Sequence, residues 1–190
     1  IAEIVVPGFR VLLKPRTGEH RKTRFDLALV DLGFTLSSAD ARLPNGLVAE
    51  ALELGGLGQF AEYSKVNREV PFGESRLDLM LDGSNGRCYI ETKSVTLVVD
   101  GVGLFPDAPT ERGAKHMRSL DQAVAEGHRA AVVFVVQRSD AVAFAPHETA
   151  DPNFCSALRH SLSCGVEVFA YNCRVSEQSI ELDSPLPVRL

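Results

Sequence analysis

Two carboxylates and a lysine lie close together in the sequence, in an order that suits chemistry on a phosphodiester. Asp78 begins one apolar segment, and Glu91 and Lys93 end the next, so the three residues form the pattern D-x12-E-x-K. Carboxylates are preferred ligands of Mg²⁺, and a lysine beside them can orient or deprotonate the attacking water or stabilise charge on the phosphate. We therefore predict a metal-dependent nuclease site, in which Asp78 and Glu91 bind the metal and Lys93 is catalytic.

The pairing of the two segments decides whether these side chains can meet. We expect strands over Arg76–Asp82 and Cys88–Lys93, joined by a four-residue loop, and this hairpin sets Asp78 opposite Glu91. A slip by one residue would mix charged and apolar side chains, because neighbouring residues of a strand point to opposite faces. In the expected register one face contains Leu77, Leu79, Leu81, Cys88, Ile90 and Thr92, and the other contains Asp78, Met80, Tyr89, Glu91 and Lys93.

This arrangement predicts the ligands of a metal ion. Asp78, Glu91 and the backbone carbonyl of Thr92 would coordinate Mg²⁺, or Mn²⁺ in its place, with waters completing an octahedron. A simpler alternative is a set of solvated residues on an exposed sheet face, with Glu91 and Lys93 as a weak surface ion pair. An isolated pattern of this kind does not decide between the two interpretations, so the surrounding elements matter.

The hairpin lies within an alternation of helices and strands that predicts a mixed α/β (α+β) fold, with a central mixed sheet flanked by helices. The run Ala130–Val136 is apolar without alternation, as is typical of a central strand covered on both faces. Glu50, on the first helix, is a further catalytic candidate. The expected elements are a helix over Pro44–Leu54, strands over Lys65–Phe72, Arg76–Asp82 and Cys88–Lys93, a helix over Thr110–Glu126, a strand over Ala130–Gln137, a helix over Asp151–Ser163 and a strand over Val166–Arg174.

The second helix has a cationic side and follows the candidate site in the sequence. At 100° per residue its apolar residues gather on one side and its basic residues on another. A cationic stripe is usually a solvated face. Its position after the Glu-x-Lys strand favours phosphate binding instead, with arginine as a bidentate donor and lysine as a point charge. The candidates for nucleic-acid binding around the site are Arg112, Lys115 and His116 on this helix and Arg76 at the start of the expected hairpin.

Several longer motifs occur in an order that resembles one family. They are Ser75–Asp78, Cys88–Leu97, Phe105–Ala108, Thr110–His116 and Leu186–Val188. On these motifs the chain resembles, nearly from end to end, the sugar fermentation stimulation proteins (SfsA), whose C-terminal domain belongs to the PD-(D/E)XK nuclease-like superfamily.

The resemblance implies roles for particular residues. Asp78, Glu91 and Lys93 would fill the metal and lysine positions of the superfamily, and Glu50 would match the acidic position on its first core helix. Glu69, on the preceding strand, is a weaker candidate. The departures from the family pattern, such as Thr92 where valine is expected, remove no charged residue from the site.

The resemblance also implies an N-terminal β domain similar to an oligonucleotide-binding (OB) barrel. We expect residues 1–38 to be a truncated remnant of that domain and residues 39–190 to form the nuclease-like domain. Its loop residues Arg21, Lys22 and Arg24 could contact a nucleic-acid backbone, or could equally be a solvated loop. The expected strands of this region are Ile4–Val6, Arg10–Leu13, Phe25–Asp31 and Phe34–Leu36.

Composition limits the function classes. The chain has 190 residues, 45% of them hydrophobic, and a net charge of −5, so attraction to DNA would be local and sensitive to salt. Its apolar stretches are shorter than a bilayer span, and a secretory signal is not visible, so we expect a cytoplasmic protein without a membrane partner. The cysteines lack C-x2-C spacing, and we expect buried free thiols rather than a zinc site.

Three functions remain open at this stage. The first is a metal-dependent DNA nuclease. The second is a DNA-binding regulator of sugar metabolism genes, with a nuclease-like fold but without turnover. The third is an acidic surface cluster with no role on nucleic acid. Retention of the two acids together with Lys93 favours the first, because binding alone gains nothing from a lysine beside two metal ligands. A homodimer is compatible with it.

Overall fold

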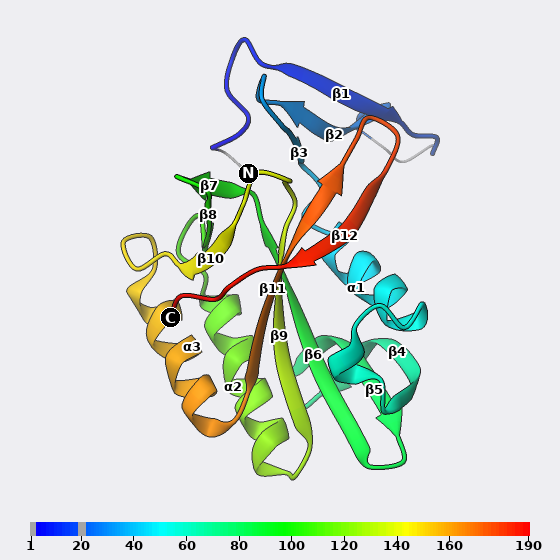
Figure 1. Cartoon of the computed structure of the whole chain (residues 1–190), viewed down its shortest axis with the longest axis vertical. Coiled ribbons are helices and arrows are strands. Elements are labelled where there is room, and N and C mark those ends of the chain that lie inside the picture. The colour runs from blue at the N-terminus through cyan, green and yellow to red at the C-terminus, as the bar shows by residue number, and fades with distance from the viewer. Residues whose placement is uncertain (1–2, 19–21) are drawn as a thin grey trace.

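A six-stranded mixed sheet forms the centre of the protein in the computed structural model, which describes residues 3–18 and 22–190 (Figure 1). The strand order is β12-β11-β9-β6-β5-β4, and β11, β9 and β6 are parallel neighbours. The predicted mixed α/β class is confirmed. The strands are β4 (Tyr63–Phe72), β5 (Ser75–Gly83), β6 (Gly86–Val95), β9 (Arg129–Val136), β11 (Glu167–Val175) and β12 (Ile180–Pro185).

The strand β9 is central, as its unbroken apolar run predicts. Residues 130–136 are all buried, and β9 pairs in parallel with β6 on one side and β11 on the other. Ala131, Val133 and Val135 point to one face of the sheet, and Val132 and Phe134 point to the other. A strand covered on both faces cannot slip without exposing apolar side chains. The strand β9 therefore fixes the register of its neighbour β6 and, with it, the position of the charged residues of β6.

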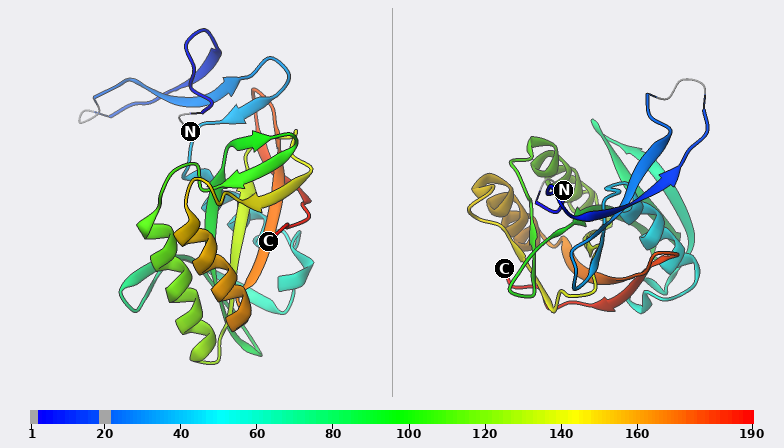
Figure 2. Two further views of the ribbon diagram at one scale, coloured as in Figure 1. Left: turned by 90° about the vertical axis from the view of Figure 1, so that its left-hand side faces the viewer. Right: turned by 90° about the horizontal axis from the view of Figure 1, so that it is seen from above.

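Helices cover both faces of this sheet. The helix α1 (Leu43–Glu53) covers one face, and α2 (Glu111–Ala125) and α3 (Pro152–Cys164) lie side by side on the other (Figures 1 and 2). Pro44 lies in the first turn of α1, where a proline is tolerated, and Gly55 follows its end with a φ of +72°. The predicted helices are confirmed to within one or two residues at each end.

From Asp82 to Leu79 the hairpin of β5 and β6 has the predicted register, but its loop is shorter than the four residues expected, because Gly83 pairs with Gly86. The expected pairing of Asp78 with Glu91 is wrong, because the ladder ends before these residues. Asp82 lies opposite Arg87, and Leu79 lies opposite Ile90. Gly83 approaches the residue before β4 closely, and a Cβ atom at this position would lie 2.6 Å from the Glu62 carbonyl oxygen. Glu91 and Lys93 follow this ladder in the C-terminal half of β6.

The two strands separate beyond the pair Leu79–Ile90, where their ladder ends. We call this opening the fork. We expected Leu77 on the same face as Leu79, and this was wrong: Leu77 packs with Tyr89 in the core under α2, while Leu79 packs in the core under α1. The alternation fails because β5 no longer follows β6 beyond the fork.

Two smaller sheets lie at the end of the molecule toward which β6 runs. One contains β7 (Leu97–Val99), β8 (Val102–Phe105) and β10 (Ala143–Pro146) in the order β10-β8-β7. The sequence did not predict these strands, because segments of three or four residues are too short to show a period.

Cys88, Cys155 and Cys173 are buried free thiols as expected, whereas Cys164 at the end of α3 is exposed.

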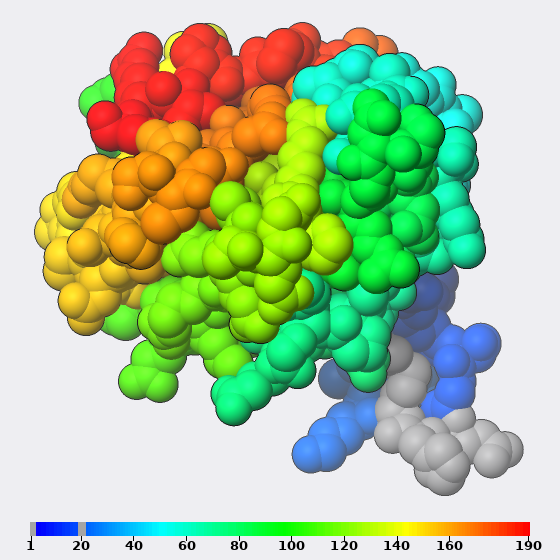
Figure 3. Space-filling view, turned by 90° about the horizontal axis from the view of Figure 1, so that it is seen from below, coloured from blue at the N-terminus to red at the C-terminus, as the bar shows by residue number. Residues whose placement is uncertain are grey.

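The second small sheet is N-terminal and antiparallel, in the order β1-β2-β3, with strands β1 (Arg10–Pro15), β2 (Phe25–Asp31) and β3 (Leu36–Ser38). The strand expected at Ile4–Val6 is wrong, because residues 3 and 4 form a turn and Ile4 is buried. The Ser38 amide donates to the Gln137 carbonyl at 3.1 Å, which joins this sheet to the end of β9. Seen from below, part of this N-terminal sheet, in blue, projects beyond the rest of the protein (Figure 3).

One buried carboxylate caps two helices at once. Asp151 accepts hydrogen bonds from the Phe154 amide at the start of α3 (2.9 Å) and from the Thr110 amide just before α2 (2.8 Å). Burial alone would raise the pKa of Asp151, but these amide donors outweigh it and hold the pKa below its ordinary value of 3.8.

Within the described ranges, none of the helices is both long and apolar enough to cross a membrane.

We expect Asp151→Asn to lower the free energy of unfolding by about 1–2 kcal/mol at neutral pH, because the new amide donor faces a backbone donor. The contribution of Asp151 is present above pH 3.8, its ordinary pKa, and is lost as the pH falls through its lower pKa in the folded protein. The difference between wild type and variant should therefore shrink in acid. Urea unfolding between pH 7 and pH 3 measures it, with the exposed Glu53→Gln as control. A difference that does not change with pH would contradict this assignment.

Candidate active site

Glu91 is the buried centre of the candidate site. Its side chain is only 3% exposed, and the two oxygens have different surroundings. Oε1 accepts a hydrogen bond from Lys93 Nζ at 2.5 Å and also contacts Nδ1 of His116. Oε2 is buried without a hydrogen-bond partner among residues 3–18 and 22–190. We call Oε2 of Glu91 the open oxygen.

The charge of Glu91 is balanced within the site. Burial by itself would raise the pKa of this carboxyl group, but the hydrogen bond from His116 and the charge and hydrogen bond of Lys93 outweigh burial and leave the pKa below its usual value. Glu91 is therefore held as a carboxylate. The simple alternative of an exposed surface ion pair does not apply, because Lys93 is only 11% exposed.

The basic residues of α2 divide into two groups. His116 is buried against Glu91, and the exposed Arg112 donates from Nε to His116 Nε2 at 3.4 Å. Lys115 is exposed and donates to the backbone carbonyl of Glu74 at 3.0 Å. His116 is therefore too buried to contact a phosphate backbone, unlike its exposed neighbours. Its contact is with Glu91.

Asp78 lies in the fork between β5 and β6. Its Oδ2 accepts hydrogen bonds from the backbone amide of Thr92 at 2.8 Å and from the Thr92 hydroxyl at 2.6 Å. The carboxylate thereby satisfies an amide beyond the last paired residues of the hairpin. Asp78 and Glu91 both lie beside Thr92, one through hydrogen bonds and the other through the chain.

Asn45 of α1 is a site residue that the sequence reasoning missed. Its buried amide nitrogen donates to Glu69 Oε1 at 2.9 Å and to Asp78 Oδ1 at 3.2 Å, and its oxygen accepts from Arg68 Nε at 3.0 Å. Glu69 has a φ of +55°, a conformation that costs a residue other than glycine about 1–3 kcal/mol and is concentrated at functional sites. The signal in the sequence was an asparagine three residues before Val48, within the apolar stripe.

The remaining candidates lie farther from this cluster. Glu50 is exposed and points about 140° around α1 from Asn45, since successive residues turn by about 100°. Arg76 is exposed on β5, two residues before Asp78, and Lys22 and Arg24 are exposed near β2. Arg21, which we also assigned to nucleic-acid binding, lies outside the described residues. Their assigned roles stay predictions.

The residues around Glu91 fit a hard divalent cation. The open oxygen is a buried anionic acceptor, and the neighbouring groups of Asp78 and Thr92 offer further oxygen atoms. In the part of the chain that is described, no three histidine, cysteine, aspartate or glutamate side chains lie close enough to hold a metal together. An ion here would thus rely on few protein ligands and on water, which is how Mg²⁺ is usually bound.

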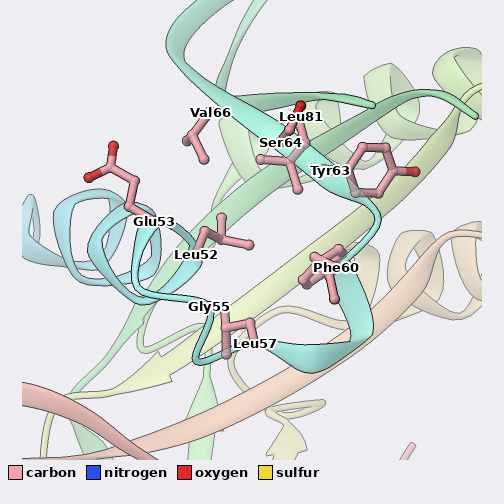
Figure 4. Close-up of a pocket in the computed structure, with 10 residues that line it drawn as sticks. Leu52, Glu53, Gly55, Leu57, Phe60, Tyr63, Ser64, Val66 and Leu81 are labelled. Carbon is pink, nitrogen blue, oxygen red and sulfur yellow. The ribbon is translucent and has the colours of Figure 1, made fainter. Parts of the chain in front are cut away.

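A pocket elsewhere on the molecule is unrelated to this chemistry. It lies between the end of α1, the 3₁₀ turn η1 (Gly58–Phe60) and the start of β4, and Figure 4 shows its mainly apolar walls. Its lining residues are Leu52, Glu53, Gly55, Leu57, Phe60, Ala61, Tyr63, Ser64, Val66 and Leu81.

Comparison with known proteins defines the class first. A family model described as the "Sugar fermentation stimulation protein RE domain" matches residues 42–179, which include the whole candidate site. A relative from Chloroflexus aggregans, "Sugar fermentation stimulation protein homolog", is 50% identical over 188 residues, covering 99% of this chain and 72% of the relative. A homolog of the same description from Moorella thermoacetica is 45% identical and covers 100% of this chain and 83% of the relative.

A solved structure is similar over the whole chain. "The structure of Pyrococcus Furiosus SfsA in complex with Ca2+" matches with a TM-score of 0.92 and 28% identity, covering 100% of this chain and 82% of the other. The chain therefore belongs to the sugar fermentation stimulation protein (SfsA) family.

We expect Asn45→Ala to lower the free energy of unfolding by about 1–3 kcal/mol in the absence of metal, because Glu69 and Asp78 lose a shared buried donor. Glu50→Ala, on the exposed side of the same helix, is the control and should change it by less than about 0.5 kcal/mol. Urea unfolding in EDTA measures both. Equal stability of the two variants would show that Asn45 does not hold the carboxylates.

Proposed function

We propose that this protein is a divalent-metal-dependent nuclease that hydrolyses phosphodiester bonds in DNA. The observation that carries the proposal is the asymmetry of Glu91, which pairs with Lys93 through one oxygen and leaves the open oxygen without a partner, one residue before Thr92, to which Asp78 is hydrogen-bonded. The pattern matches the metal and lysine positions of the PD-(D/E)XK superfamily. Membership of the SfsA family and the RE description of the matching domain support it.

The metal would be held by Asp78, Glu91 and the backbone carbonyl of Thr92. When bound, Mg²⁺ or Mn²⁺ polarises a phosphoryl oxygen and lowers the pKa of a water molecule. The Ca²⁺ complex of the Pyrococcus furiosus protein supports a divalent site, because Ca²⁺ and Mg²⁺ share a preference for oxygen ligands.

Lys93 is the chain's own catalytic group in this proposal. Its ammonium group has three protons, and the contact with Glu91 uses one of them. The others can orient the attacking water and stabilise charge that builds on the phosphate. The low exposure of Lys93 strengthens these interactions, since bulk water competes with them less than at an open surface.

Exposed cations around the site would hold the flanking phosphates. Arg112 and Lys115 on α2 and Arg76 on β5 are exposed and lie on elements that border Glu91 or Asp78. Arginine can bind a phosphate through two parallel donors, whereas lysine acts as a point charge. Because the whole chain carries a net charge of −5, we expect binding to depend on these local groups and to weaken with added salt.

Cleavage of labelled single- and double-stranded DNA in Mg²⁺, Mn²⁺ or EDTA tests the proposal. We expect cutting that requires the metal and falls by at least about 100-fold in Lys93→Ala, because that variant loses the ammonium beside the phosphate. Lys65→Ala, an exposed lysine on β4, makes the same change of charge and should cut like the wild type.

Two outcomes would contradict the proposal. Undiminished cutting by Lys93→Ala would remove the chemistry from this site. Wild-type protein that binds DNA in a salt-sensitive way without cutting it in either metal would instead favour the DNA-binding regulator.

A further inference from the structure

We infer that His116 is a positioning residue of the proposed metal site: supported by Arg112, it holds Glu91 so that Oε1 is engaged by the protein and the open oxygen is left for a divalent cation. The inference rests on the proposed function and assigns to His116 a role other than contact with a phosphate. It concerns the affinity for metal and does not depend on the cleavage step.

The two carboxylate oxygens of Glu91 differ in their hydrogen-bond partners. Lys93 Nζ lies 2.5 Å from Oε1, and His116 Nδ1 contacts the same oxygen, so two donors converge on one atom. The open oxygen of the same carboxylate is buried and receives neither. A buried acceptor of this kind is unfavourable by itself, and a bound cation would relieve it.

The second observation fixes the direction of the hydrogen bonds. Arg112 Nε lies 3.4 Å from His116 Nε2, and a guanidinium group can only donate. His116 Nε2 must therefore accept, and the ring proton lies on Nδ1, where it can be donated to Oε1 of Glu91. Lys93 Nζ, 3.5 Å from Nδ1, is a second donor to the same oxygen.

The third observation is the support of the ring itself. Arg112 and His116 are four residues apart on α2, so they share one side of the helix. The buried neighbours Met117 and Leu120 anchor α2 in the core, and Asp151 fixes its start through the Thr110 amide. The imidazole is consequently held at a set distance from β6, as residues that orient metal ligands are in other proteins.

Calorimetric titration of Mn²⁺ into the metal-free full chain, without DNA, tests the inference. We expect His116→Ala to weaken the affinity by about 10–100-fold, the usual effect of removing a group that orients a ligand. His116→Asn should remain within about threefold of the wild type, because its amide N–H takes the place of Nδ1–H. His160→Ala, an exposed histidine on α3, is the matched control and should bind like the wild type.

A second variant guards against simple loss of folding. Arg112→Met changes an exposed residue and leaves the buried ring in place, so it should fold like the wild type and still bind Mn²⁺ more weakly. Thermal unfolding of each variant without metal shows whether the loss of affinity exceeds any loss of structure.

The outcomes separate this inference from the proposed function. Unchanged Mn²⁺ affinity in folded His116→Ala would overturn the inference and leave the nuclease proposal standing. Equal weakening in His116→Asn and His116→Ala would also overturn it, since the donor would not matter. A wild type that binds Mn²⁺ but does not cut DNA would overturn the nuclease alone, and a wild type that binds no Mn²⁺ would overturn both.

Discussion

The separation of β5 from β6 beyond the pair Leu79–Ile90 is the constraint on which the site depends. If the ladder continued, the Thr92 amide would be bonded to β5, and Asp78 would have no reason to enter the gap. Because the strands part, the carboxylate takes that amide instead. On β4, which pairs with the other edge of β5, Glu69 has a left-handed backbone conformation. This conformation costs about 1–3 kcal/mol, which burial of the apolar cores on both faces of the sheet offsets.

The fork also explains why the site uses both faces of the sheet. Asn45 reaches Asp78 from α1 on one face, and His116 reaches Glu91 from α2 on the other. The two helices pack in different cores on opposite faces of the sheet. The buried strand β9 pairs with β6 and holds it in place between the two helices. It therefore fixes the position of the contacts that reach the site from each face.

The sequence predicted those features that depend on local periodicity. The register of the hairpin, the central place of β9 and the limits of the long helices follow from alternation, apolar runs and breaker residues. The face of Leu77 was wrong, and Asn45 was missed, because both depend on where β5 leaves β6. His116 was grouped by charge with its helical neighbours, whereas tertiary contact with Glu91 decides its environment.

The charges around the fork have a thermodynamic consequence. Among the side chains that these hydrogen bonds connect, the carboxylates and the cationic groups are equal in number, so their formal charges cancel. A divalent cation would turn this set positive, and a polyanion would restore the balance. If both bind here, their binding would be linked, and each would strengthen the other by the same factor. The groups concerned are Glu69, Asp78 and Glu91 on one side of the balance and Arg68, Lys93 and Arg112 on the other.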